Sequence, residues 1–470
     1  MIPMTLAEVA AVTGGRLHRA SGDEPVRAVE FDSRRIGPGG LFVALPGERA
    51  DGHDHAAAAV AAGAAGVLAA REVPAPAVIA PPAPAAAAGR SYLAAVDRDG
   101  AGAAVLAALA RLAAHGLRAL PDLAVVGVTG SSGKTSTKDL LAAVLAPLGE
   151  TVAPPGSFNN ELGLPWTALR AGPGTRHLVL EFSARGPGDI AALCAVAAPR
   201  IGVVLNVGRA HLGEFGSAAA IAAAKGELVE ALPAGGTAVL NADDPAVAAM
   251  ATRTAARVVT FGGGDADVRS RDLTLHRGRP RFTLVAAQGT AEVALPLVGA
   301  HHVHNALAAA AVGLELGATP AQVAAALADA VPASRWRMEV TERSDGVTVV
   351  NDAYNANPES VRAALASLAA IGAGGRTWAV LGRMGELGEA SAAAHAEVAA
   401  AARRLGVDEL VAVDCPEYGA ARAVAGVEEA AALLAAELRP GDVVLVKASR
   451  AVGLERLAAV LLAAVPAVRR

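Results

Sequence analysis

The sequence contains little cysteine and no large excess of either charge. Its 470 residues include only two cysteines, Cys194 and Cys415, which lie far apart in the chain. That number and spacing argue against a disulfide framework or a cysteine-based metal site. The formal net charge is −4, so we expect no general attraction to nucleic acid or to an anionic membrane. A polyanionic ligand must therefore be recognised at a local site.

Aromatic residues are also scarce, and long hydrophobic runs are interrupted. Aromatics make up 3% and charged residues 18%, whereas hydrophobic residues reach 53% because alanine is abundant. Alanine favours helices and close packing. The longest uncharged stretches, 73–89 and 293–314, contain proline and glycine, so neither predicts a membrane-spanning helix. The first residues lack the basic segment of a signal peptide. We expect a cytoplasmic protein with no nucleic-acid or membrane partner.

The chain is long enough for several domains, and its first part predicts a small α/β domain. Residues 1–98 mix short strand-like runs, such as Leu41–Leu45, with an alanine-rich helical segment near 56–62. A proline- and alanine-rich stretch at 73–88 lies near the end of this part.

The remaining sequence predicts two further α/β domains. Residues 99–331 alternate continuous apolar runs, such as Leu123–Val128, with helical segments, a pattern typical of βαβ units and a mostly parallel sheet. Residues 267–298 predict hairpins beside that sheet. Residues 332–470 repeat the alternation and predict a smaller, Rossmann-like domain.

The most informative motif is GVTGSSGKT at 127–135. It follows a predicted buried strand and begins a helix, which is the context of a phosphate-binding loop. Backbone N–H groups would approach phosphate oxygens, Lys134 would reach the β- and γ-phosphates, and Thr135 would bind Mg²⁺. The usual spacing requires glycine at Val128, but Gly127 stands one position earlier. The expected ATP contacts here are Gly130, Ser131, Ser132, Gly133, Lys134 and Thr135, and Ser136 receives no role.

Three further side chains are candidates for the chemistry that follows phosphate binding. Glu181 ends a predicted strand, where a carboxylate can hold Mg²⁺ or lie at the surface. His211 follows another strand, at the edge where parallel sheets bind ligands, although a structural role is also open. Lys225 lies in an alanine-rich segment and by itself is typical of a solvated helix lysine.

Together these segments resemble the Mur ligase family, ATP-dependent enzymes that form amide bonds in peptidoglycan precursors. The phosphate loop matches the family's TGxxGKT, and 158–165 (FNNELGLP) is similar to its NNxxGxP segment. Residues 301–306 (HHVHNA) resemble HNxxN, with His302 in place of asparagine. Arg337-Met338-Glu339 resembles the Arg-x-Glu at the start of the last domain. The resemblance extends over nearly the whole chain.

The resemblance implies a site for ATP and two Mg²⁺ ions. Thr135 and Glu181 would bind the first ion, and His211 with a carbamylated Lys225 the second. Asn305 would contact adenine, Asp352 the ribose, and Arg337 the γ-phosphate. The catalytic residues implied in this way are Lys134, His211, Lys225 and Arg337.

The resemblance also implies the other two ligands. NDAYNANP (351–358) and LGRMGELGE (381–389) are most similar to members that join D-alanyl-D-alanine to UDP-N-acetylmuramoyl-tripeptide. Residues 1–98 would bind the uridine diphosphate end, 99–331 ATP and 332–470 the dipeptide, in a protein that we expect to be a monomer. The implied substrate-binding residues are Ser33, Arg34, Arg35, Asn159, Asn160, Asn355, Asn357, Lys447 and Ser449.

Three alternatives are weighed against this interpretation. A ligase that adds the third peptide residue would show DYAHxP at 351–358, and its diaminopimelate form would carry DNPR, which is absent. A folylpolyglutamate synthase is disfavoured by the N-terminal segment at 32–47. A nucleotide-gated binding protein would have no need of the second-metal set. The effects of His302 and Arg383, which depart from the family pattern, stay open, as does the identity of the third residue of the tripeptide.

Overall fold

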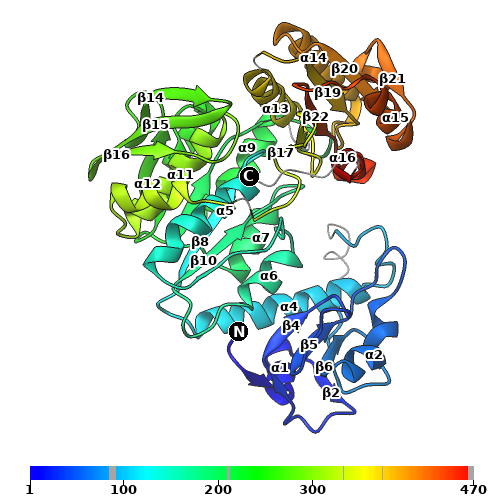
Figure 1. The fold of residues 1–470 in the computed structure, drawn as a ribbon. Helices are drawn as coiled ribbons and strands as arrows, with labels where there is room; N and C mark the ends of the chain where they lie inside the picture. Colours follow the sequence, from blue (N-terminus) through cyan, green and yellow to red (C-terminus); the bar gives the residue numbers. More distant parts are fainter. Residues whose placement is uncertain (84–91, 209–211, 332, 373, 464–470) are drawn as a thin grey trace.

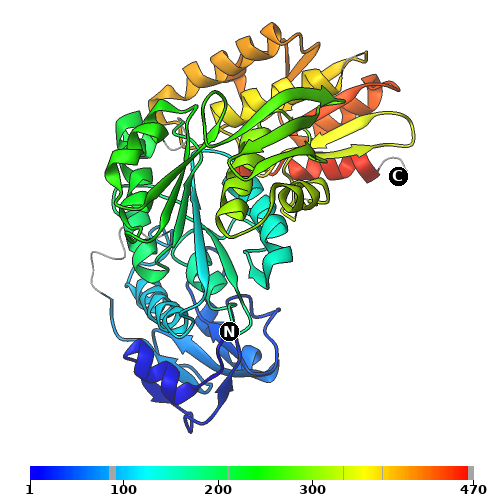
Figure 2. The ribbon, with the colours of Figure 1, turned by 90° about the vertical axis from the view of Figure 1, so that its left-hand side faces the viewer.

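The computed structural model describes residues 1–83, 92–208, 212–331, 333–372 and 374–463. Its strands form three large sheets and one small two-stranded sheet. The large sheets divide the chain into three α/β domains, as the sequence predicts, although the boundaries at residues 98 and 331 stay predictions. The first and last domains lie at opposite ends of the central one (Figures 1 and 2).

The first domain is built on a five-stranded sheet in the order β2-β7-β6-β5-β4. All its pairs are parallel except β2 with β7. The proline-flanked segment contributes the short strand β7, which is buried. Its elements are β1 (Met4–Thr5), α1 (Leu6–Thr13), β2 (Arg16–His18), β3 (Pro25–Val26), β4 (Ala28–Glu30), β5 (Gly40–Val43), η1 (Gly52–His55), α2 (Ala56–Ala61), β6 (Ala64–Ala69) and β7 (Ala77–Ile79).

The central domain has a nine-stranded sheet in the order β16-β15-β14-β13-β12-β11-β8-β10-β9. The hairpin strands β14 to β16 extend this sheet rather than lying beside it, because β14 pairs with β13. The elements are α4 (Ala101–Arg118), β8 (Ala124–Thr129), α5 (Lys134–Leu145), η2 (Ala146–Leu148), β9 (Thr151–Val152), α6 (Gly163–Ala168), β10 (His177–Glu181), α7 (Asp189–Val196), β11 (Ile201–Val204), α8 (Leu212–Phe215), α9 (Ala218–Glu230), β12 (Thr237–Asn241), α10 (Pro245–Ala248), η3 (Ala249–Arg253), β13 (Arg257–Gly262), β14 (Val268–His276), β15 (Arg279–Ala286), β16 (Gly289–Ala294), α11 (His302–Glu315) and α12 (Pro320–Ala328).

The last domain has a six-stranded sheet in the order β17-β18-β22-β19-β20-β21, in which only the edge strand β17 is antiparallel. Of the candidate residues of this part, Arg337 precedes β17, Asp352, Asn355 and Asn357 follow β18, and Lys447 and Ser449 lie at or just after the end of β22. The elements are β17 (Glu339–Glu342), β18 (Thr348–Asn351), α13 (Pro358–Ile371), β19 (Thr377–Leu381), η4 (Gly388–Ala390), α14 (Ser391–Arg404), β20 (Glu409–Val413), η5 (Pro416–Tyr418), β21 (Arg422–Val424), α15 (Val427–Glu437), β22 (Val443–Lys447), η6 (Arg450–Val452) and α16 (Glu455–Ala463).

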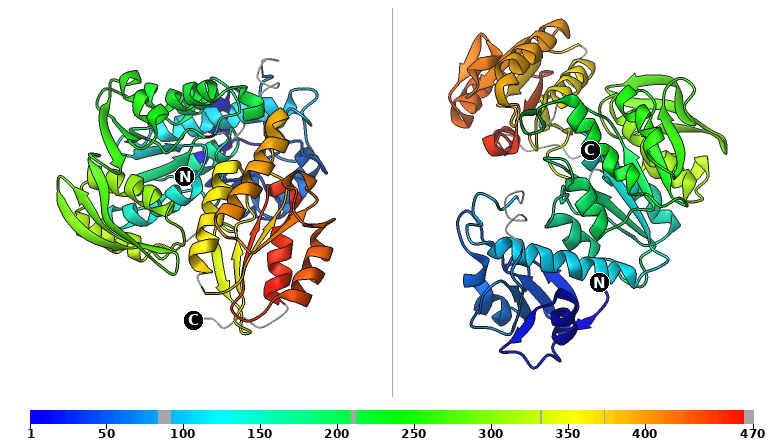
Figure 3. Two further views of the ribbon diagram at one scale, coloured as in Figure 1. Left: turned by 90° about the horizontal axis from the view of Figure 1, so that it is seen from above. Right: turned by 180° about the vertical axis from the view of Figure 1, so that it is seen from behind.

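The long helix α4 joins the first domain to the central one (Figure 3, right). Its side chains Val105, Leu109 and Leu112 repeat at helical spacing and are fully buried. They belong to one hydrophobic core that contains residues of both domains, such as Leu6 and Trp166. This shared core makes the first two domains one packed unit. No helix among the described residues is long and apolar enough to cross a membrane.

Candidate active site

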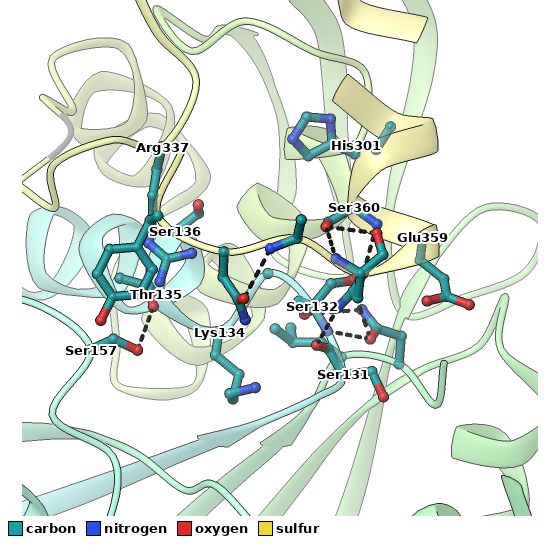
Figure 4. A pocket seen from close by; sticks show the side chains of 18 of the residues that line it. Ser131, Ser132, Lys134, Thr135, Ser136, Ser157, His301, Arg337, Glu359 and Ser360 are labelled. Carbon is teal, nitrogen blue, oxygen red and sulfur yellow. Dashed lines mark hydrogen bonds between the residues drawn. The ribbon is translucent and has the colours of Figure 1, made fainter. Parts of the chain in front are cut away.

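A cavity of about 800 Å³ lies between the central and last domains. The phosphate loop and the start of α11 line one side, and Arg337, Asp352 and Lys447 line the other. Figure 4 shows Lys134 and Thr135 in the same pocket as Arg337, Glu359 and Ser360, which come from distant parts of the chain. The cavity therefore gathers the predicted nucleotide-binding residues of two domains.

The phosphate loop connects β8, which lies between β10 and β11 in the sheet, to the N-terminus of α5. Gly133 has φ +83°, and a Cβ atom there would lie 2.7 Å from Asn305 Oδ1, so only glycine fits. Gly127 serves packing instead, because a Cβ there would lie 2.8 Å from the Phe182 ring. Glycine at position 127 is therefore explained by close packing of β8 against Phe182, and Gly133 still provides the backbone conformation that the phosphate loop needs.

Asn206, which follows β11, holds the phosphate loop in shape. Its Oδ1 accepts a hydrogen bond from Ser132 N (3.0 Å), and its Nδ2 donates to Ser132 O (3.2 Å). Gly208 N donates to Ser131 Oγ (2.9 Å). These contacts join loop residues to a strand end more than seventy positions away. Sequence reasoning overlooked Asn206, although it lies in the NVGRAHL segment that drew attention to His211.

Lys134 begins α5, and its ammonium Nζ donates to the Gly130 carbonyl (2.6 Å) across the loop. Burial lowers the pKa of Lys134. The carboxylates of Glu181 and Glu386 oppose this shift, and the Arg337 guanidinium adds to it. Glu386 was not predicted from sequence. It lines the cavity and has a positive φ of 62°.

Glu181 is fully buried at the end of β10. Its Oε2 accepts hydrogen bonds from Thr135 Oγ1 and Ser157 Oγ (both 3.2 Å) and from Asn159 Nδ2 (3.4 Å). Its Oε1 has no partner among the described residues. An unpaired, buried carboxylate oxygen is costly, so this atom is available for a cation. Ser157 is a second contact that sequence reasoning missed, because no motif marks it.

Lys225 lies on α9 and is buried, contrary to the solvated helix lysine that its local sequence suggests. Burial and the nearby Lys134 charge lower the pKa of Lys225 to about 7. A large share of this amine is therefore neutral at neutral pH. His211, its expected partner, lies outside the described residues. The described residues contain no cluster of three His, Cys, Asp or Glu side chains that could hold a metal by themselves.

Lysine is used sparingly in this chain, and each lysine lies in the interior or at the cavity. The sequence has four, at positions 134, 138, 225 and 447, so most basic residues are arginine. Lys138, Lys225 and Lys447 are at most 6% exposed. Lys134 and Lys447 line the cavity.

Two histidines whose rings are in tilted contact line the cavity near Asn305. The rings of His301 and His302 lie 4.2 Å apart, and His302 Nδ1 is 3.3 Å from Asn305 Nδ2. Burial lowers the pKa of His301 to about 4 and that of His302 well below its usual value. Both rings are therefore neutral at physiological pH. His302 thus occupies the asparagine position of the family motif with an uncharged, hydrogen-bonding side chain.

Arg337 and Asp352 face the cavity from the last domain. The Arg337 guanidinium lies over the Tyr354 ring, with Cζ 4.2 Å from its centroid. Asp352 Oδ1 accepts from Met338 N (3.1 Å), and Oδ2 accepts from Lys447 Nζ (2.5 Å). A ribose hydroxyl would have to share these oxygens. Lys447 also donates to the Asn355 carbonyl (2.8 Å), so its ammonium is already engaged.

Asn357 connects the last domain to the phosphate loop. Its Oδ1 caps α13 by accepting from Ser360 N (2.8 Å), and its Nδ2 donates to Ser131 O (3.3 Å). Ser449 Oγ accepts from Gly385 N (2.7 Å). Both side chains line the cavity, but their visible contacts are with the protein itself. Gly213 N donates to Glu386 O (3.3 Å) and adds another contact between these two domains.

The predicted uridine-diphosphate residues lie in the first domain, outside the residues that line this cavity. Arg34 pairs with Asp32 (2.8 Å), and Arg35 Nε lies 3.8 Å from Glu30 Oε2. Ser33 is in the same turn. The adjacent Phe31 ring lies 5.8 Å from the Phe158 ring, just before Asn159.

Asn159 and Asn160 are neighbours with different contacts. Asn159 reaches Ser157 Oγ (3.0 Å) and Glu181, and it lines the cavity. Asn160 Oδ1 accepts from Gly163 N (2.9 Å) at the start of α6. The structure thus brings Asn159 to the Glu181 carboxylate, and it places Asn160 at a helix start.

Comparisons with known proteins agree with this geometry. Residues 25–115, 128–313 and 336–450 match the descriptions "Mur ligase family, catalytic domain", "Mur ligase middle domain" and "Mur ligase, glutamate ligase domain". The UDP-N-acetylmuramoyl-tripeptide--D-alanyl-D-alanine ligase of Mycobacterium tuberculosis is 55% identical to this chain, with 98% of each covered.

Two solved structures are also similar over most of their length. MurF from Acinetobacter baumannii superposes with a TM-score of 0.83 at 29% identity and covers 97% of this chain and 98% of its own. The MurF ligase of Thermotoga maritima in complex with ADP gives 0.76 at 32% identity and covers 93% and 97%. From its fold, its site and these similarities, the chain belongs to the Mur ligase family.

Proposed function

We propose that this protein is an ATP-dependent ligase that joins D-alanyl-D-alanine to UDP-N-acetylmuramoyl-tripeptide. The observation that carries the proposal is an interdomain cavity lined by the phosphate loop, whose Thr135 donates to the buried carboxylate of Glu181. A second buried residue, Lys225, interacts with Lys134 of the same loop and has a lowered pKa of about 7. The 55% identity to the UDP-N-acetylmuramoyl-tripeptide--D-alanyl-D-alanine ligase of Mycobacterium tuberculosis, over 98% of the chain, supports the choice of substrates. The cytoplasmic location and the monomeric state stay predictions.

The residues present fit a magnesium site. Thr135 Oγ1 and the unpaired Glu181 Oε1 are hard oxygen donors, and phosphate oxygens of ATP would complete the coordination. When bound, Mg²⁺ neutralises charge on the phosphates. The Lys225 amine fits carbamate formation because it is buried and its pKa is lowered to about 7, so a substantial share is neutral near that pH. Its nitrogen would form a bond to the carbon of CO₂ and release a proton, which converts a cation into an anionic ligand for a second ion, together with His211.

The reaction would proceed in two transfers. A carboxylate oxygen of the tripeptide attacks the γ-phosphorus of ATP, the bond to the β-γ bridging oxygen breaks, and ADP leaves. The amine of D-alanyl-D-alanine then attacks the acyl carbon of the resulting acyl phosphate and loses a proton. The C–O bond breaks, and phosphate departs with the former carboxylate oxygen. Lys134 and the loop amides would stabilise the charge on the transferring group.

Contacts between the two domains would protect the acyl phosphate from water. Asn357 donates across the cavity to the phosphate loop, and Arg337 enters from the last domain beside Lys134. Asn305 would contact adenine and Asp352 the ribose, and Asn355, Lys447 and Ser449 would form the wall near the dipeptide. Exclusion of water at this stage prevents hydrolysis of the activated acyl group.

The first domain would hold the far end of the long precursor. The turn that contains Ser33, Arg34 and Arg35 would bind the uridine diphosphate. Phe31 precedes this turn and contacts Phe158, the neighbour of Asn159, and Asn159 in turn donates to Glu181, so these contacts mark a path from the turn to Glu181. We infer that the peptide of the precursor follows this path and presents its carboxylate near Glu181.

An isotope experiment tests the proposed reaction. We expect tripeptide labelled with ¹⁸O at its terminal carboxylate to transfer one labelled oxygen into inorganic phosphate during turnover with D-alanyl-D-alanine. The same assay with UDP-N-acetylmuramoyl-dipeptide and L-lysine or diaminopimelate is the control, and it should release little phosphate. Unlabelled phosphate would contradict acyl-phosphate chemistry, and preferential turnover of the control substrates would assign the chain to the third-residue ligases.

Replacing Glu181 with glutamine tests the magnesium site. We expect the Mg²⁺ concentration for half-maximal activity to rise at least about tenfold. The thermal stabilisation given by Mg²⁺ with a non-hydrolysable ATP analogue should also be lost, which is a readout independent of turnover. Asp97→Asn is the control, because Asp97 is a buried carboxylate outside the cavity that caps α4. Equal Mg²⁺ dependence in wild type and Glu181→Gln would contradict the assignment.

A further inference from the structure

A buried ion pair on α5 has no part in the chemistry described above. Lys138 and Asp139 form this pair, with side chains that are 1% and 9% exposed. Removing two charges from water costs free energy that mutual attraction alone often fails to recover. The proposed phosphate binding uses Lys134 and Thr135, which lie one helical turn earlier on α5. It does not need Lys138 or Asp139. Its other contacts point to a different role.

The pair binds the segment that connects the central and last domains. Asp139 Oδ2 accepts from Ser334 N (3.1 Å), and its Oδ1 accepts from Ser334 Oγ (3.2 Å). Lys138 Nζ donates to Ser334 Oγ (3.2 Å) and to the Pro154 carbonyl (2.8 Å). Ser334 is itself buried. The connecting segment is therefore fixed, through backbone and side chain, to the helix that carries the phosphate loop.

The same segment is fixed to the last domain only two residues later. Trp336 N donates to Glu339 Oε1 (2.8 Å), and Tyr354 N donates to Trp336 O (3.1 Å). Met338 N donates to Asp352 Oδ1 (3.1 Å). Trp336 and Met338 have positive φ angles of 61° and 51°, a backbone conformation that persists only where surrounding contacts impose it. Arg337 lies between these two residues.

We propose that Lys138 and Asp139 are positioning residues that fix the pivot of the last domain and thereby align Arg337 with the phosphate loop. Between the attachment at Ser334 and that at Trp336 only Arg335 remains, so rotation between the domains is concentrated there. Because Lys134, Thr135 and the pair share α5, the pivot and the phosphate loop move as one body. This inference rests on the proposed role of Arg337 at the γ-phosphate.

A double-mutant cycle between Asp139 and Arg337 tests the proposal. We expect Asp139→Ala to lower kcat about 10- to 100-fold while KM for ATP changes less than about threefold, because the phosphate loop is intact and the alignment is lost. In an Arg337→Ala background the same substitution should change kcat less than about twofold. Equal fold-losses in both backgrounds would overturn the proposal. Asp329→Asn, five residues before Ser334 and exposed, is the control.

Alanine at position 139 leaves the Lys138 charge buried without its partner, and this variant can fail to fold. The double variant Lys138→Met/Asp139→Leu removes both charges and keeps apolar bulk, so the cycle can be repeated with it. We expect the same two results: the double variant lowers kcat in the wild-type background, and it lowers kcat no further when Arg337→Ala is already present. An equal fold-loss of kcat with and without Arg337→Ala in this variant too would overturn the positioning role.

A distance measurement tests the pivot without any turnover. Spin labels at Asp265→Cys and Glu428→Cys occupy exposed positions of the central and last domains, and both native cysteines are buried. We expect Asp139→Ala, or the charge-free double variant, to broaden the distance distribution of the full chain relative to wild type and Asp329→Asn. An unchanged width would overturn the pivot. If the wild-type protein does not turn over the proposed substrates, the proposed function is wrong. The distance measurement still tests whether Lys138 and Asp139 fix the pivot, because it requires no turnover.

Discussion

Replacing Lys134 with alanine is expected to reduce ADP formation by about 10²- to 10³-fold. The side chain lies at the N-terminus of α5, and its ammonium donates a hydrogen bond to the Gly130 carbonyl across the loop. With ATP bound, the same ammonium would turn to the phosphates and stabilise the charge that develops during transfer. A steady-state assay of ADP release with all three substrates measures the loss.

The fold should survive this substitution, because the hydrogen bond that Lys134 donates in the described part of the chain goes to the Gly130 carbonyl of its own loop. We expect the melting temperature of Lys134→Ala without ligands to remain within a few degrees of wild type. Lys134→Arg is the matched variant, and it should also lose most activity because a planar guanidinium does not fit the narrow loop. Wild-type rates in the alanine variant would refute the phosphate-loop role.

Replacing Lys225 with alanine is the second substitution with a large expected effect. If the carbamate holds a metal ion, its loss should lower kcat by a factor comparable to that for Lys134, roughly 10²-fold or more. Short carboxylates such as acetate should restore part of the activity, because they can occupy the volume left by the side chain and supply an anionic oxygen. Mass spectrometry of the intact wild type should show the addition of one CO₂.

The pH dependence of carbamate formation follows from the Lys225 pKa. Only the neutral amine reacts with CO₂, and the folded protein has a pKa of about 7 for this group, lowered from the usual value. Occupancy in limiting bicarbonate should therefore rise as pH increases through 7 and fall below it. An active alanine variant, together with no CO₂ adduct in wild type at pH 8, would rule out the carbamate.

The sequence predicted those parts of the site that local patterns encode. The phosphate loop was found because glycines, Lys134 and Thr135 follow a buried strand directly. Glu181 was found because its strand is a continuous apolar run that ends in an acid. Lys225 could not be assigned from its surroundings, since an alanine-rich helix gives no sign of which face is buried. There the family resemblance supplied the correct expectation of burial.

Contacts between distant segments could not be predicted. That Asn357 binds the dipeptide stays a prediction, but nothing in the sequence indicated that its side chain caps α13 and donates to Ser131, 226 residues away. Ser157 joins the Glu181 cluster through a loop without a motif. In the fold, the alternating pattern of 267–298 predicts hairpins, but it does not say that the strand from Val268 continues the parallel sheet, because that depends on its pairing with Phe261.

The scarcity of lysine in this chain has a practical consequence. All four ε-amines lie in the interior or at the cavity, and arginine supplies the remaining basic charge of the surface. Amine-directed reagents such as cyanate or acylating probes would therefore find few competing sites outside the nucleotide pocket. Bound nucleotide should protect individual lysines from these reagents, and peptide mapping would measure that protection. The protection would report occupancy of the pocket and domain motion, with little modification of other lysines.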